Sequence, residues 1–261
     1  MPLSVVITAA GSSRRMGGVN KLLVDLGGRP VLVRTLETFA GLDFVDRIVV
    51  TANAACVETY RALVSEFKIP KVCCVIEGGK ERQDSIFKAL QVLEKENCSF
   101  VAVHDGARPL ASAAMSTDLY LGLLRGRMID ETEVRPSKAS EWEELEKEAL
   151  NGLESGCREV LGTIPGVPVK DTIKRVDSSG LAEETLVRSE LRAVQTPQIF
   201  FFVPLIEAYR RAYSDNYLAT DDAGLIERYA GRVLVMPGEY SNLKITTVDD
   251  ISLAERLLEE M

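Results

Sequence analysis

The residues best suited to chemistry lie near the start of the chain, in the segment ITAAGSSRRMGGVNK (residues 7–21). The small residues at positions 9–13 let backbone N–H groups approach an anion closely. Arg14, Arg15 and Lys21 add three positive charges. Phosphoryl and nucleotidyl transfer depend mainly on positioning phosphates and neutralising their charge, so this loop suits such reactions. The alternative, a surface turn with scattered basic residues, explains the combination less well.

This loop matches neither of the two common phosphate-binding patterns. The Walker A pattern GxxxxGK[ST] is absent from the chain, and GxGxxG does not follow the first expected strand. An NAD-type Rossmann dehydrogenase needs that glycine pattern for close approach of its pyrophosphate, so this class is excluded.

A second chemical segment is IEGGKERQDSIFKAL (residues 76–90), in which an expected strand ends in two glycines and a helix begins near Arg82. Asp84 and Ser85 fall in the first helical turn, where N–H donors face outward. The two side chains either contact a ligand or cap the helix, and the sequence leaves both interpretations open.

The third segment, VAVHDGARPL (residues 101–110), is an apolar strand that delivers polar side chains at its end. Asp105 beside a triphosphate site is a natural Mg²⁺ ligand, directly or through water. His104 is the sole histidine of the chain. It could serve as a catalytic base, but a lone histidine at the end of a strand is more often structural, and we expect a structural role.

The elements that position these residues follow from the alternation of β-branched apolar runs with amphipathic stretches. This alternation predicts an α/β fold with a mostly parallel, twisted sheet flanked by helices, in a single domain covering residues 1–261. Ligands of such sheets bind at the carboxyl ends of the strands. The expected strands are residues 4–8, 47–51, 71–76, 100–104, 162–165 and 232–236, and the clearest helices are 30–39, 57–67 and 82–94.

Residues 124–160 interrupt this alternation with a charged insertion that contains the only tryptophan, Trp142. Within it, residues 140–150 predict an exposed helix with Ser140 as a possible N-cap. Leu145 and Leu150 offer only a thin apolar stripe. We therefore expect an appended, mobile surface excursion.

Residues 169–196 form a second interruption, in which DSSG (residues 177–180) is a turn signal between two polar runs. A hairpin this polar cannot bury a core of its own. We expect an extended β-arm that projects from the domain and packs on a second subunit, giving a homodimer.

Composition restricts the partners and the compartment. The formal net charge of −8 gives the chain no overall attraction for a polyanion, so we expect no nucleic-acid binding. No apolar run reaches the roughly 18 residues of a membrane span, and the N-terminus does not have a signal-peptide pattern. The five cysteines show no metal-ligand spacing and are expected to be reduced thiols, so we predict a cytoplasmic protein.

Three further segments complete the set of motifs. They are PVKDTIKR (168–175) followed by Arg188 and QTPQIF (195–200), ATDDAGLIE (219–227) and NLKITTVDDISLAE (242–255). In the last of these, Lys244 taken alone is better explained as a solvated lysine before a helix.

Together these segments resemble one family, the 2-C-methyl-D-erythritol 4-phosphate cytidylyltransferases of the non-mevalonate isoprenoid pathway. AAG..RRM alone is shared with many sugar nucleotidyltransferases, whereas the set with PVKDTIKR and TPQ is much more specific. The resemblance implies a Rossmann-like nucleotidyltransferase fold. It also implies that CTP and methylerythritol phosphate give the CDP-alcohol and pyrophosphate, with a divalent cation, usually Mg²⁺. The resembling motifs are AAGSSRRM with Lys21, GGKERQDS, HDGARP, PVKDTIKR, the run from Arg188 to TPQ, ATDDA and NLKIT.

The resemblance implies roles for the cationic positions. Arg15 and Lys21 match residues that stabilise the charged pentacoordinate phosphorus. Thr172, Arg188 and Lys244 match residues that grip the methylerythritol phosphate, and the residue like Arg188 comes from the arm of the second subunit. We therefore take Arg15, Lys21, Arg188 and Lys244 as the expected catalytic residues.

The resemblance also implies how the nucleotide is held. Ala10, Gly11, Gly79 and Ser85 match positions that contact the cytosine and ribose, partly through the backbone. Asp105 matches a position near the methylerythritol hydroxyls and the metal.

The sequence departs from the family pattern at Lys80, where an acidic or other polar residue is frequent, and in the long insertion at 124–160. The choice of Arg15 over its neighbour Arg14 rests on motif alignment. Two alternatives stay open: a ribitol-5-phosphate cytidylyltransferase, which shares most loop motifs, and a non-catalytic nucleotide-binding protein of the same fold.

Overall fold

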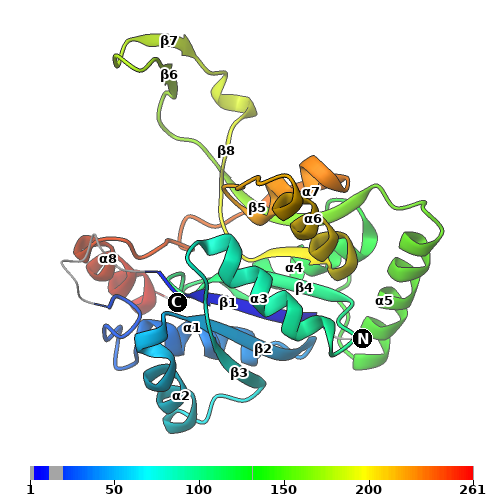
Figure 1. Cartoon of the computed structure of the whole chain (residues 1–261), viewed down its shortest axis with the longest axis horizontal. Helices are drawn as coiled ribbons and strands as arrows, with labels where there is room; N and C mark the ends of the chain where they lie inside the picture. Colours follow the sequence, from blue (N-terminus) through cyan, green and yellow to red (C-terminus); the bar gives the residue numbers. More distant parts are fainter. Residues whose placement is uncertain (1–2, 12–19, 131, 261) are drawn as a thin grey trace.

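The computed structural model describes residues 3–11, 20–130 and 132–260, and its centre is one twisted sheet (Figure 1). The strands lie in the order β10-β5-β9-β4-β1-β2-β3, with β8 paired to β5. Pairing is parallel except where β9 meets β4 and β5, and where β8 meets β5. The strands are β1 (Leu3–Ala9), β2 (Val45–Ala52), β3 (Val72–Glu77), β4 (Phe100–Asp105), β5 (Val160–Pro168), β8 (Arg192–Val194), β9 (Gln198–Phe201) and β10 (Arg232–Pro237).

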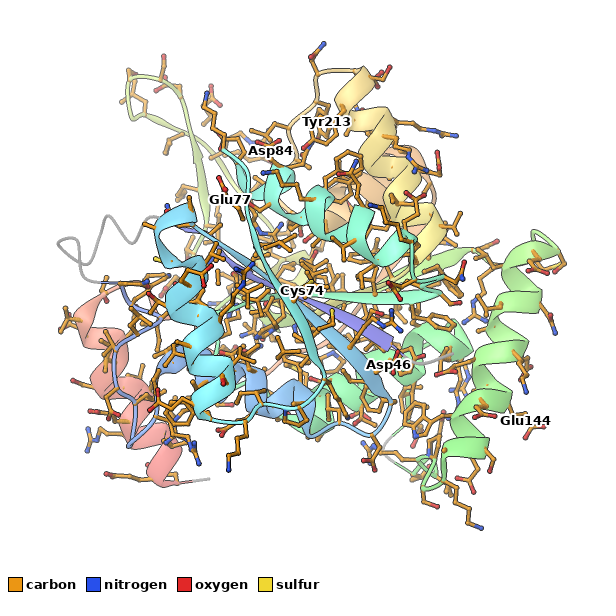
Figure 2. The ribbon with its side chains drawn as sticks, turned by 60° about the horizontal axis from the view of Figure 1, so that its bottom comes forward. Asp46, Cys74, Glu77, Asp84, Glu144 and Tyr213 are labelled. Carbon is orange, nitrogen blue, oxygen red and sulfur yellow. The ribbon has the colours of Figure 1, made fainter. Side chains whose placement is uncertain are left out.

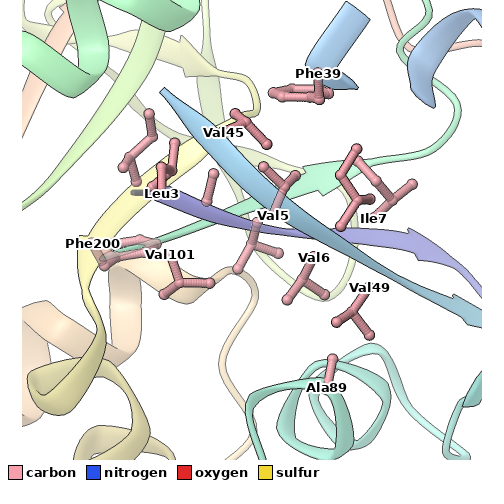
Figure 3. Packing of buried hydrophobic residues seen from close by; sticks show 14 of the residues in the cluster. Leu3, Val5, Val6, Ile7, Phe39, Val45, Val49, Ala89, Val101 and Phe200 are labelled. Carbon is pink, nitrogen blue, oxygen red and sulfur yellow. The ribbon is translucent and has the colours of Figure 1, made fainter. Parts of the chain in front are cut away.

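Helices cover both faces of this sheet, which confirms the predicted α/β class. β1 is apolar on both of its faces because α1 packs on one side and α3 on the other, as Phe39 and Ala89 show in Figure 3. No helix in the described part of the chain is both long and apolar enough to span a membrane. The helices are α1 (Val31–Ala40), α2 (Val57–Glu66), α3 (Arg82–Glu94), α4 (Ala113–Arg125), α5 (Ala139–Glu154), α6 (Phe202–Ser214), α7 (Asp222–Tyr229) and α8 (Val248–Glu259).

The six expected strands all form, but β8 and β9 were not among them. β9 pairs antiparallel with β4 and β5, in the middle of the sheet. Its sequence QIFF is fully buried and too short to show a periodicity. Only the tertiary pairing of this short segment makes it a strand.

The expectation of an exposed, thinly apolar helix in the insertion is wrong for one face of α5. Trp142 is 8% exposed, and its ring stacks on Tyr120 with 5.5 Å between centroids and contacts Phe44 at 4.8 Å. The Tyr120 hydroxyl also donates a 2.7 Å hydrogen bond to the buried Glu146. Trp142 and Glu146 share a face because they are four residues apart. The helix begins at Ala139, so the proposed N-cap at Ser140 lies inside its first turn instead.

The arm projects from the sheet as a two-stranded hairpin of β6 (Lys174–Val176) and β7 (Ala182–Thr185), as expected (Figure 1). Its turn is fixed by Asp177, whose Oδ1 accepts hydrogen bonds of 2.9 Å from the backbone N–H groups of Ser179 and Leu181. Gly180 takes the left-handed conformation, with φ +87°, that other residues avoid.

If α5 is part of the folded core, Trp142→Ala should lower the free energy of unfolding by about 3 kcal/mol, the usual cost of emptying a buried aromatic site. Glu144, on the outer face of α5 in Figure 2, provides the matched control. Glu144→Ala should change stability by less than about 0.5 kcal/mol. Urea denaturation measures both. Equal stabilities for the two variants would mean that α5 is a mobile appendage after all.

Candidate active site

A pocket of about 720 Å³ opens at the carboxyl ends of β1, β2 and β4. Seven of the ten predicted site residues line it, although their roles remain predictions. They are Ala10, Gly11, Lys21, Gly79, Ser85, Asp105 and Lys244. Arg15 lies outside the described residues. The pocket therefore brings together residues from the first, second, third and last chemical segments.

The described lining of this pocket is positively charged. Its four cations, Lys21, Lys80, Arg82 and Lys244, outnumber its two carboxylates, Glu81 and Asp105. The local charge is still +1 when Asp222, the buried partner of Arg82, is counted with them. The chain as a whole carries −8. A concave surface that reverses the overall sign of the protein focuses its field on an anionic ligand.

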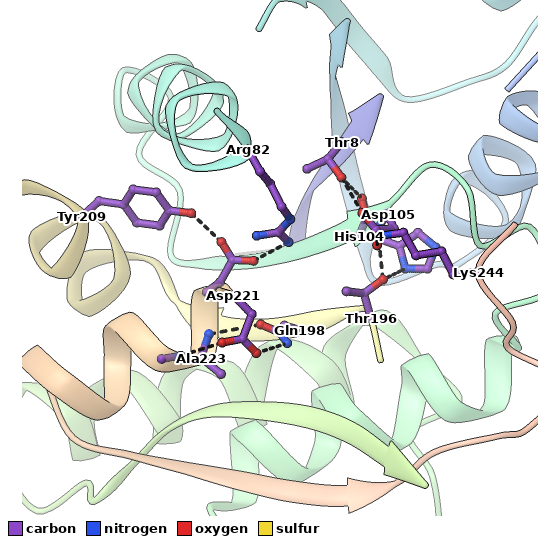
Figure 4. A network of polar contacts seen from close by, with 12 residues as sticks. Thr8, Arg82, His104, Asp105, Thr196, Gln198, Tyr209, Asp221, Ala223 and Lys244 are labelled. Carbon is purple, nitrogen blue, oxygen red and sulfur yellow. Dashed lines mark hydrogen bonds and ion pairs between the residues drawn. The ribbon is translucent and has the colours of Figure 1, made fainter. Parts of the chain in front are cut away.

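Lys21 and Lys244 both line the pocket near the C-terminal segment. Lys21 Nζ donates a 2.6 Å hydrogen bond to the backbone oxygen of Ile245. Lys244 Nζ lies 2.6 Å from Asp105 Oδ2, and Thr8 Oγ1 donates to Asp105 Oδ1 at 3.0 Å (Figure 4). The interpretation of Lys244 as a merely solvated lysine is therefore wrong in this fold.

Asp105 is held in its charged form. Burial would raise the pKa of this carboxyl, but the positive charges of Lys244, Arg82 and Arg108 outweigh burial. The pKa of Asp105 is therefore well below its ordinary value, and the group is a carboxylate at neutral pH.

The glycine turn after β3 is fixed from the first turn of α3. The Gly79 N–H donates to Ser85 Oγ at 2.9 Å, and Ser85 Oγ donates to the Glu81 oxygen at 3.1 Å. Asp84 Oδ2 accepts from the Glu81 N–H at 2.9 Å, so Asp84 acts as the helix cap. The capping interpretation is confirmed for Asp84. Ser85 lines the pocket, and its contact with a ligand stays a prediction.

Arg82 is a pocket residue that the sequence analysis did not single out. Its Nη2 lies 2.7 Å from Asp222 Oδ2, and that carboxylate is fully buried on α7, where it also accepts a hydrogen bond from Tyr209. Burial would lower the pKa of Arg82, but the charge of Asp222 raises it, so the guanidinium stays charged. The sequence signal for this ion pair was Asp222, the second aspartate of ATDDA. Because Arg82 and Asp222 are 140 residues apart along the chain, no local pattern showed that they pair.

His104 is fully buried, in keeping with a structural role. One ring nitrogen is 3.1 Å from the Arg108 backbone oxygen and the other is 3.1 Å from Thr196 Oγ1. The ring packs on Phe39, with 4.6 Å between centroids. Burial lowers the pKa of His104 to about 4, so the imidazole is neutral and both of its nitrogens are engaged.

Thr172 and Arg188 are not brought to this pocket within one chain. Both are exposed on the arm, where Arg188 Nη1 donates to the Lys170 backbone oxygen at 2.7 Å. Arg188 instead lines a second hollow with Lys170, Arg192 and Tyr240. The two residues expected at the methylerythritol phosphate therefore stand apart from those expected at the nucleotide.

The sheet and the cation-lined pocket at its strand ends define a Rossmann-like nucleotidyltransferase fold. The family model described as 2-C-methyl-D-erythritol 4-phosphate cytidylyltransferase matches residues 3–125 and 145–260 of the chain. It leaves residues 126–144, inside the charged insertion, unmatched.

Curated relatives and solved structures agree with this match. A protein of that name from Symbiobacterium thermophilum is 41% identical over all 261 residues and 94% of its own length. One from Halalkalibacterium halodurans is 36% identical over the whole chain and 98% of its own length. The crystal structure of a 4-diphosphocytidyl-2C-methyl-D-erythritol synthase from Anaerococcus prevotii superposes with a TM-score of 0.75 at 27% identity, covering 99% of this chain and 98% of the other.

The chain therefore belongs to the 2-C-methyl-D-erythritol 4-phosphate cytidylyltransferase family. This confirms the resemblance drawn from the motifs, and with it the expectation of a nucleotidyltransferase.

The buried histidine makes a pH prediction. Its pKa is about 4 in the folded protein, against an ordinary 6.5, so below about pH 6.5 only the unfolded chain takes up the proton. The free energy of unfolding should therefore fall by about 2 kcal/mol between about pH 7 and pH 5. Urea denaturation across this range measures the slope.

His104→Gln supplies the control, because no other histidine titrates in this chain. The variant should be less stable at neutral pH but should lose much less stability between about pH 7 and pH 5. A slope unchanged by the substitution would assign the pH dependence to other groups.

Proposed function

We propose that this chain transfers the cytidylyl group of CTP to 2-C-methyl-D-erythritol 4-phosphate, giving the CDP-alcohol and pyrophosphate for isoprenoid precursor synthesis. The family assignment supports the reaction, and the observation that carries it to this molecule is the positively charged pocket. Such a pocket suits a triphosphate bound at the carboxyl ends of parallel strands.

In this reaction an oxygen of the substrate phosphate bonds to the α-phosphorus while the bond to pyrophosphate breaks. Negative charge accumulates on the oxygens around that phosphorus, so fixed cations lower the barrier. We assign this role to Lys21 and to Arg15. Lys244 and the arm residues Thr172 and Arg188 would hold the methylerythritol phosphate.

The nucleotide would occupy the part of the pocket built by small residues. Ala10 and Gly11 follow β1 directly and leave their backbone accessible. Gly79 has no room for a side chain, because an added Cβ would come within 2.1 Å of the Asp84 Cβ. Together with Ser85, these positions suit close backbone contacts to cytosine and ribose.

A magnesium ion at Asp105 is part of the proposal, although both oxygens of this carboxylate already contact Lys244 and Thr8. No group of three or more His, Cys, Asp or Glu residues suited to a metal occurs among the residues that the structure describes. Mg²⁺ typically takes one or two carboxylates and completes its shell with water and substrate phosphates. Asp105 is the residue that would hold it, and the ion would neutralise triphosphate charge.

A second subunit would complete the site. Arg188 and Thr172 lie on the arm, away from the pocket of their own chain. Apolar side chains on the same arm are exposed, among them Leu181 at 69% and Val187 at 59%. A homodimer would cover this surface and carry Arg188 to the partner's pocket. The cytoplasmic location stays a prediction.

The choice of alcohol phosphate is tested by pyrophosphate release, with CTP, UTP and ATP each combined with methylerythritol phosphate and ribitol phosphate. CTP with methylerythritol phosphate should be the fastest pair. Lys21→Ala should lower kcat about 100-fold while CTP still binds, because charge neutralisation acts mainly in the transition state. Lys147→Ala, an exposed substitution on α5, is the matched control.

Release with ribitol phosphate alone would establish the ribitol enzyme instead. Release with neither alcohol, together with CTP binding, would favour the non-catalytic protein. Unchanged turnover in Lys21→Ala would remove this lysine from the mechanism.

The shared site is tested by mixing two variants, Lys21→Ala and Arg188→Ala, each expected to be nearly inactive. A mixed dimer has one site with neither substitution, provided that Arg188 acts on the partner's pocket. Half of randomly mixed dimers are of this kind, so about a quarter of wild-type activity should return. No recovery after verified subunit exchange would place Arg188 at its own pocket.

A further inference from the structure

A β-bulge on the edge strand β3 interrupts its pairing with β2. Ile48 pairs with Val72 and the next residue, Val49, pairs with Cys74, so Cys73 is an extra residue in β3. Side chains of a regular strand alternate between the two faces of a sheet, whereas a bulge redirects one of them. β3 is the last strand in the order of the sheet, and Cys74 lies on it in Figure 2.

The bulge brings two thiols together. The sulfur atoms of Cys73 and Cys74 are 3.7 Å apart, and both residues line one groove of about 580 Å³ with Arg47 and Glu96. Cys73 is exposed and Cys74 is half-buried, so the pair is open to a small reagent. Two accessible sulfur atoms this close together can bind one atom at the same time, as a chelating site does.

The contact between the two thiols, helped by Arg47, favours a thiolate at Cys73. Arg47 reaches Glu96 with a 2.9 Å ion pair and stands beside the two thiols. The hydrogen bond from Cys74, and the charge of Arg47, bring the pKa of Cys73 to about 7. The pKa of Cys74 is raised, so Cys73 is the first nucleophile of the pair and Cys74 reacts second, as a thiol.

The sulfur spacing also matches a single bridging atom. Two bonds of about 2.3 Å to one atom hold their sulfurs roughly 3.4–3.8 Å apart for bond angles of about 95–109°. A structural zinc ion would need three or four protein ligands, and no such group occurs among residues 3–11, 20–130 and 132–260. A centre that needs two protein sulfurs fits better.

We propose that Cys73 and Cys74 form a two-thiol site that captures thiophilic trivalent arsenic compounds. With an arylarsine oxide, the two S–H groups are replaced by two S–As bonds. The two protons leave with the arsenic-bound oxygen as one water molecule, and no electrons are transferred to or from the protein. The site lies apart from the nucleotide pocket and does not depend on the proposed reaction.

Phenylarsine oxide is the probe. Intact-mass measurement of the full-length reduced protein should find one phenylarsenic group per chain. The adduct should survive excess 2-mercaptoethanol, which removes arsenic held by one thiol, and should be released by 2,3-dimercaptopropanol. Cys73→Ser and Cys74→Ser should each weaken retention about 100-fold, because the second bond of a chelate forms at high effective concentration.

Cys157→Ser provides the matched control, because Cys157 is an exposed thiol outside the groove. This variant should retain the adduct as the wild type does. Retention by either Cys73→Ser or Cys74→Ser, or its loss in Cys157→Ser, would overturn the proposal. So would a wild-type adduct that 2-mercaptoethanol removes.

Discussion

The site depends on how the segment before α8 closes over the carboxyl ends of β1 and β4. Asn242 is fully buried, and its backbone oxygen accepts a 2.6 Å hydrogen bond from Arg108. The Ile245 N–H donates to the Ala107 oxygen at 2.8 Å. Lys244 stands between these anchors, so its charge is fixed against Asp105. Without this closure the pocket would lose its link between the first and last parts of the chain.

Charge balance explains why this closure holds. The ion pair between Asp105 and Lys244 sits in a pocket where burial alone would raise the pKa of the carboxyl group, and three nearby cations outweigh that effect. The pair of Arg82 with the fully buried Asp222 follows the same rule, because a buried charge is tolerated when a partner is within hydrogen-bond reach. Both pairs join segments distant in sequence, and both keep cations directed at the ligand space.

The two interruptions of the α/β alternation have opposite physical characters. The charged insertion contributes Trp142 to an aromatic cluster with Phe44 and Tyr120, so part of it belongs to the core. The arm has its own two-stranded pairing but leaves Leu181 and Val187 in solvent. The insertion buries its tryptophan within its own chain. The arm leaves apolar side chains exposed, and a partner would cover them.

The sequence by itself determined the fold class and the family, because strand alternation and ordered motifs are local patterns. It also located Lys21, Asp105 and Lys244 at the pocket, although the pattern around Lys244, taken alone, favoured a solvated lysine. The tertiary structure decided what distant residues do to one another. It paired Arg82 with Asp222 and closed the pocket. No local pattern contains these outcomes, because they depend on which side chains meet after the sheet has formed.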